Sequence, residues 1–208
     1  MIKGAPFYDD RDRYYVQTNN PTEQILKKEG KGGWLESCGS VALTNCMGVL
    51  GKDFVITCVG GFQPQIDEIV TGYFNDPRNY KKFLIVRPNL DPALPTSPPG
   101  NRVPQYFPLA AKEIFGVRGV YMELPSTIDL WAEVVSELVQ GNPVQVCLKD
   151  PGHYIAVVAY DEDTNEIIIN DSWPARFANQ DGFNRRIGRK DIDSGPENWK
   201  NFIVIYSL

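Results

Sequence analysis

Residues 152–173 read GHYIAVVAYDEDTNEIIINDSW, and this stretch carries the clearest structural signal in the sequence. Two apolar runs rich in β-branched residues, Tyr154–Tyr160 and Glu166–Asn170, flank the polar segment 161–165. Short apolar runs of this kind separated by a few turn-forming residues predict an antiparallel β-hairpin. We therefore expect an antiparallel sheet in the last third of the chain.

The rest of the chain divides into a helical and a β-rich part. Helical spacing of apolar residues precedes the hairpin, and strand-like runs surround it, which is the α+β pattern. We expect a single domain over 1–208, with a helical half at about 14–140 packed on an antiparallel β-sheet half at about 141–208. Residues 1–21 are expected to be irregular and 75–104 to form a long binding loop. The expected helices are 22–29, 37–50, one from about 63 to 74, 105–115 and 128–140, and the further strands are 144–148 and 202–206.

Composition excludes several classes of protein. The net charge of −5 argues against a nucleic-acid partner, and no apolar run is long enough for a membrane span. The first ten residues lack the apolar core of a signal peptide, so we expect a cytoplasmic protein or one exported by another route, with the compartment left open. The four cysteines form no Cys-x-x-Cys pair, so no metal site is expected, and no cofactor is expected either. A chain of this length needs no disulfide framework, so the cysteines are expected to be mostly reduced.

Cys38 is the cysteine best placed for chemistry. It lies at the start of the predicted helix 37–50, where unpaired backbone N–H groups and the helix dipole favour a thiolate. The alternative is an inert thiol of the core. Cys46 and Cys147 lie among apolar residues and are expected to be core residues. The sequence around Cys58 gives no signal of a catalytic partner.

His153 is the only histidine, so any Cys–His pair must use it. If the hairpin turn has five residues, paired residue numbers sum to 326, and His153 and Asp171 become diagonal neighbours on one face. A four-residue turn shifts the sum by one and brings Asn170 to that face instead. Spacing alone does not choose between these two residues, and a purely structural role for the histidine stays open.

Together these segments resemble a known family. Residues 14–19 (YYVQTN), 37–40 (SCGS), 152–161 and 169–173 are similar to the papain-like cysteine peptidases akin to the bacteriocin leader-processing, double-glycine peptidases. The resemblance covers about 14–50 and 128–208 and implies a papain-like fold. It also implies a catalytic triad in which Cys38 is the nucleophile, His153 the acid and base, and Asp171 the residue that orients the ring.

The oxyanion-hole glutamine of that family departs from its usual place. The family often has it six residues before the cysteine, where this chain has Gly32. Looser members carry it in a Tyr-Tyr-x-Gln segment, which makes Gln17 the choice here and Gln24 the reserve.

The resemblance implies a thiol protease that hydrolyses peptide bonds through a thioester acyl-enzyme. The expected partner is a peptide, protein or peptidoglycan substrate, and the expected source is bacterial or phage. Two alternatives remain at this stage: a catalytically inactive binding or structural module that keeps the scaffold, and a cysteine-dependent acyltransferase.

Overall fold

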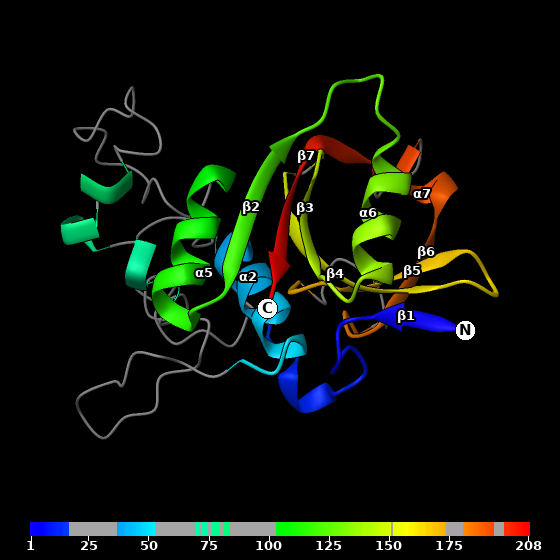
Figure 1. Ribbon diagram of the computed structural model, residues 1–208, viewed down its shortest axis with the longest axis horizontal. Coiled ribbons are helices and arrows are strands. Elements are labelled where there is room, and N and C mark those ends of the chain that lie inside the picture. Colours follow the sequence, from blue (N-terminus) through cyan, green and yellow to red (C-terminus); the bar gives the residue numbers. More distant parts are fainter. Residues whose placement is uncertain are drawn as a thin grey trace, which may run out of the picture.

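The computed structural model describes residues 1–16, 37–52, 70, 72–74, 76–79, 81–83, 103–150, 152–173, 181–193 and 198–208. In this part of the chain a twisted β-sheet lies at the centre, with helices on both of its faces (Figure 1). The helices are α2 (Cys38–Val49), α5 (Phe107–Phe115), α6 (Leu130–Val139) and α7 (Arg189–Asp193), with 3-10 turns η1 (Arg11–Arg13), η3 (Pro77–Asn79) and η5 (Pro104–Tyr106). The strands are β1 (Ile2–Gly4), β2 (Arg118–Glu123), β3 (Val144–Leu148), β4 (Tyr154–Asp161), β5 (Glu166–Asn170), β6 (Arg185–Gly188) and β7 (Trp199–Ser207).

All of the strand pairs are antiparallel. The order across the sheet is β2-β7-β3-β4-β5-β6, and β1 pairs with the end of β4, beyond the residues of β4 that pair with β3. Helices packed on an antiparallel sheet confirm the predicted α+β class.

The strong hydrophobic runs were predicted correctly, and the edge strands were not. Helices α2, α5 and α6 and strands β3, β4, β5 and β7 lie where the apolar patterns place them. The prediction that residues 1–21 are irregular is wrong at β1, and β1 and β2 bring the sheet outside the expected half at 141–208. Residues 77–79 and 81–83 are helical within the expected loop at 75–104. Of the expected helix at 63–74, residues 70 and 72–74 are helical, and the expected helix at 22–29 lies outside the described residues.

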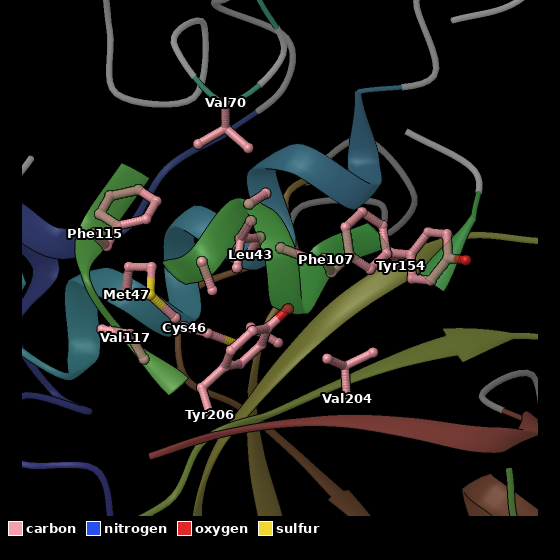
Figure 2. Packing of buried hydrophobic residues seen from close by; sticks show 14 of the residues in the cluster. Leu43, Cys46, Met47, Val70, Phe107, Phe115, Val117, Tyr154, Val204 and Tyr206 are labelled. Atoms are coloured by element: carbon pink, nitrogen blue, oxygen red, sulfur yellow. The ribbon is translucent and has the colours of Figure 1, made fainter. Parts of the chain in front are cut away.

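Two hydrophobic clusters cover opposite faces of the sheet. Successive residues of β4 alternate between them: Tyr154 and Ala156 belong to the cluster under α2 and α5, and Ile155 and Val157 to the cluster under α6. Figure 2 shows the first cluster, in which Leu43, Cys46 and Met47 of α2 lie near Tyr206 and Val117. The layers are therefore α2 and α5, then the sheet, then α6.

Helix α2 is the central helix of the described structure. Each residue from Gly39 to Val49 is buried, as expected for a helix that is largely apolar all round. It ends at Gly51, which has a left-handed backbone with φ of 72°. The Phe7 ring lies only 2.5 Å from the position of a Cβ at Gly51, so this turn also requires a glycine on steric grounds.

A bulge in β4 sets the register of the hairpin. Asp161 pairs with Glu166, so the turn has four residues, 162–165, and the paired numbers sum to 327 there. The register shifts between Val157 and Ala159, and on the side of the bulge away from the turn, at Val157 and Ala156, the paired numbers sum to 326. An extra residue on one strand is the definition of a β-bulge. The hairpin thus has the shorter of the two turns considered, and the bulge restores at its open end the register expected for the longer one.

Candidate active site

Cys38 is the first residue of α2, as its sequence position predicts. Its side chain is partly exposed, whereas the rest of the helix is buried. The backbone N–H groups of a first helical turn are not used by the helix itself, and they favour a negative charge. A sulfur at this place is therefore accessible and lies beside backbone N–H groups that the helix leaves unused.

His153 and Asp171 are paired at the open end of the β4–β5 hairpin. Nε2 of His153 lies 2.7 Å from Oδ1 of Asp171, and the two side chains are 3% and 0% exposed. The Trp173 ring lies against the imidazole edge-on, with 5.8 Å between the ring centroids. This is the diagonal contact that the 326 register predicts, and the bulge in β4 produces it.

The same imidazole has Cys38 as a second partner. Burial on its own lowers the pKa of His153, but the hydrogen bond to Asp171 and the interaction with Cys38 outweigh it and raise this pKa to about 9. Because Nε2 is bound to Asp171, Nδ1 is the ring nitrogen that faces the sulfur. The structure thus brings together the three residues that the sequence predicted for the chemistry.

Backbone groups hold Asp171 in place. Its Oδ1 also accepts a hydrogen bond from the Trp173 backbone N–H at 2.9 Å, and its own N–H donates to the Gly182 carbonyl at 2.8 Å. The Tyr14 hydroxyl donates to the Asp171 carbonyl at 2.6 Å. A Cβ at Gly182 would lie 2.0 Å from that carbonyl oxygen, so only glycine fits there. Sequence reasoning missed Tyr14 and Gly182, because neither shows its partner without the fold.

Asn170, the alternative to Asp171, makes a different contact. Its Oδ1 accepts a hydrogen bond from the Asn184 backbone N–H at 3.0 Å, and the residue is buried. Asn184 has a left-handed backbone with φ of 49°, which asparagine tolerates better than most residues. Asn170 therefore supports the turn beneath Asp171, and the carboxylate rather than the amide lies on the His153 ring.

A buried amide holds the start of α2 against the sheet. Nε2 of Gln145 in β3 donates to the Gly39 carbonyl at 3.0 Å, and its Oε1 accepts from the Tyr206 hydroxyl at 2.6 Å. All of these side-chain atoms are in the core, since Gln145 and Tyr206 are 0% exposed. The signal in the sequence is a single polar residue in the apolar run 144–148, and sequence reasoning missed its role.

The other described thiols are set apart from Cys38 by burial. Burial raises the pKa of the Cys147 thiol to about 11, and it raises the pKa of Cys46 well above its usual range. Cys38, Cys46 and Cys147 are all free thiols. The expectation that Cys46 and Cys147 belong to the core is confirmed, and Cys58 lies outside the described residues.

Gln17 and Gln24, the choice and the reserve for the oxyanion hole, also lie outside the described residues. The segment just before Gln17 is described and runs along α2. Oδ1 of Asn45 accepts from the Tyr15 N–H at 2.8 Å, and its Nδ2 donates to the Tyr15 carbonyl at 3.1 Å. Arg13 lies against Gly48, further from Cys38, so this segment runs towards the Cys38 end of the helix.

Comparison with known proteins places the chain in a family. The family model described as the Peptidase_C39 like family matches residues 11–191, which is well over half of the 208 residues. The chain belongs to the Peptidase_C39 like family. This family membership confirms the resemblance inferred from the sequence, and the architecture is the expected α+β class.

Other comparisons add little to this assignment. The peptidase domain of Streptococcus mutans ComA, known from a crystal structure, is similar to this chain with 14% sequence identity and a TM-score of 0.33. The match covers 51% of this chain and 75% of that one. A search of curated proteins found no match. Among the described residues, no helix is both long and apolar enough to cross a bilayer.

Proposed function

We propose that this member of the Peptidase_C39 like family is an active thiol peptidase that uses Cys38, His153 and Asp171 as its triad. One observation carries the proposal: a single imidazole is bound by a buried carboxylate through Nε2 and has the thiol of a helix N-terminus as its other partner. Nucleophile, base and orienting group in this order are the arrangement that activates a cysteine.

The first step is attack on a peptide carbonyl. The raised pKa of His153 favours a protonated ring at neutral pH, and an imidazolium beside a thiol favours the thiolate. The Cys38 thiolate adds to the carbonyl carbon and forms a tetrahedral intermediate. His153 then gives its proton to the leaving amine, and a thioester to Cys38 remains.

Water completes the cycle. The neutral His153 accepts a proton from a water molecule, and the resulting hydroxide attacks the thioester. The acid and the Cys38 thiolate are released, and His153 is left protonated, as at the start of the cycle. Asp171 holds the ring in one tautomer and orientation throughout. Both side chains are buried, which keeps this carboxylate–imidazole contact away from water.

The developing oxyanion needs donors placed in advance. We assign this role to the backbone N–H of Cys38, at the start of α2, and to the side-chain amide of Gln17, with Gln24 in reserve. The support for Gln17 is the direction of the segment that precedes it, which Asn45 holds along α2 towards Cys38.

The substrate is a peptide bond in a protein or in a peptidoglycan cross-link, and the source is bacterial or phage. The family supports a peptide or protein substrate in general terms. Purified sacculi and a proteome-derived peptide library, both followed by mass spectrometry, separate the two substrate classes.

The proposal is tested with Cys38→Ala. We expect no cleavage of either substrate preparation by this variant, with a circular dichroism spectrum and thermal transition like those of the wild type. Cys147→Ala is the matched control, because it makes the same change at a buried thiol, and it should retain cleavage. Cleavage by Cys38→Ala at the wild-type rate would refute the assignment.

Alkylation provides a test that needs no substrate. Iodoacetamide should modify Cys38 below about pH 8, while the buried Cys46 and Cys147 stay unmodified in the folded protein. Sluggish reaction of Cys38 would favour the inactive binding or structural module. If cleavage products carry an added amine instead of water, the chain is an acyltransferase.

A further inference from the structure

One short segment near the N-terminus contacts both sides of the proposed site. Tyr14 donates its hydroxyl to the Asp171 carbonyl at 2.6 Å, although the two residues are 157 positions apart. The next residue, Tyr15, is held by both polar atoms of the Asn45 side chain in α2. Adjacent residues thus connect the helix that carries Cys38 with the strand end that carries Asp171.

The Tyr14 side chain is itself fixed. Its ring packs on Phe183, with 5.5 Å between the centroids, and the Arg11 guanidinium lies over the other ring of this pair at 5.3 Å from the Phe183 centroid. Arg11 also forms an ion pair with Asp181. Burial raises the pKa of Tyr14 well above its usual range, so the hydroxyl stays protonated and can donate over the whole physiological pH range.

The carbonyl that Tyr14 binds is close to the reacting groups. The Asp171 backbone is held on its N–H side by Gly182 and on its carbonyl side by Tyr14. The carboxylate of the same residue lies 2.7 Å from Nε2 of His153. A short aspartate side chain has few rotatable bonds, so its backbone position decides where the carboxylate lies.

We propose that Tyr14 is a positioning residue of this site, because its hydroxyl fixes the Asp171 backbone and thereby keeps the carboxylate on the His153 ring. This inference rests on the proposed function. Tyr14 acts through its hydrogen bond to Asp171. A residue with only a structural role would not affect His153. Loss of the Tyr14 hydroxyl, in contrast, should change the pKa of His153, which Tyr14 influences through Asp171.

Tyr14→Phe tests the proposal, with Tyr160→Phe as the matched control. Tyr160 loses the same atom, but its hydroxyl donates to Asn165 Oδ1 at 2.9 Å in the β4–β5 turn. The protein has one histidine, so protein labelled with ¹³C-histidine gives a single ring signal, that of His153, whose shift reports its pKa directly. We expect Tyr14→Phe to lower this pKa by about 0.5 or more and Tyr160→Phe to leave it unchanged.

Turnover should change in parallel. We expect kcat of Tyr14→Phe to fall about three- to tenfold with KM unchanged, since one hydrogen bond that orients the site is lost. The NMR titration does not need turnover, so it tests Tyr14 even if the chain proves to be inactive. An unchanged His153 pKa in Tyr14→Phe overturns the proposal, whether or not the protein cleaves peptides.

A second variant covers the case in which Tyr14→Phe does not fold. Phe183→Leu keeps the Tyr14 hydroxyl and removes the ring on which Tyr14 rests. The proposal then requires that the His153 pKa falls in Phe183→Leu, by less than the amount expected for Tyr14→Phe, while the thermal transition stays normal. No change in this variant counts equally against the proposal.

Discussion

The two faces of the sheet are both buried, but they are built differently. The face under α6 is packed with aliphatic side chains and two tryptophans, among them Leu138, Ile155 and Trp199. The face under α2 has a comparable apolar cluster and, in addition, buried polar side chains that bind backbone groups, such as Asn45 and Gln145.

The difference follows from what each face has to fix. The free energy gained by burying apolar groups is roughly proportional to the buried area and has no preferred direction. It therefore stabilises the α6 side without fixing the positions of individual atoms. Hydrogen bonds have a direction and a narrow range of length, so they can set where a helix end lies relative to a strand end. We therefore expect the α2 side to supply both stability and the placement of α2, and the α6 side to supply mainly stability.

The largest effect is expected at the open end of the hairpin. Asp171→Ala removes the carboxylate on His153 and should lower kcat about 10³- to 10⁴-fold, as loss of a triad member does. Asn170→Ala removes only the contact with the Asn184 backbone, and its kcat should fall less than about tenfold. Steady-state kinetics of the two variants measure this contrast, and equal losses would mean that the amide takes part in the chemistry.

A variant on the opposite face should separate stability from geometry. Leu138→Ala creates a cavity under α6 and should lower the free energy of unfolding by about 2–5 kcal/mol. Urea unfolding measures this loss, and the pKa of His153 and the alkylation rate of Cys38 should stay at their wild-type values below the transition. A change in either of them would show that the α6 face also positions the site.

The pH dependence of stability provides the smallest and most specific contrast. The pKa of His153 is raised from an ordinary 6.5 to about 9, so the protonated ring favours the folded state. Its contribution, up to about 3 kcal/mol, is complete below pH 6.5 and is lost as the pH rises to about 9. His153→Gln lacks it, so the difference in unfolding free energy between wild type and variant should shrink across this range. A constant difference would contradict the raised pKa.

Strongly apolar elements could be predicted from the sequence. Helix α2 and strands β3, β4 and β5 are buried on more than one side, so nearly every residue in them is apolar. The edge strands could not be predicted in the same way. β6 carries Arg185 and Arg186, and charged residues on an edge strand protect it from unwanted pairing but hide its pattern.

The site could be predicted in part. The contact between His153 and Asp171 follows from alternation along the hairpin, which depends only on neighbouring residues. The bulge at Val158 could not be foreseen, because Val158 and Ala159 both fit the core and nothing in the sequence marks the extra residue. Contacts of Tyr14 and Gly182 join distant segments, so they appear only once the fold is known.

The residues of the proposed site lie far apart in the sequence, and this separation has a consequence for biosynthesis. Residues 39–152 contain no histidine, so a chain emerging from the ribosome carries Cys38 without His153 for on the order of ten seconds. The Asp171 N–H has its hydrogen-bond partner only after Gly182 has been synthesised as well. The nascent polypeptide therefore carries the thiol well before the residues around it can assemble.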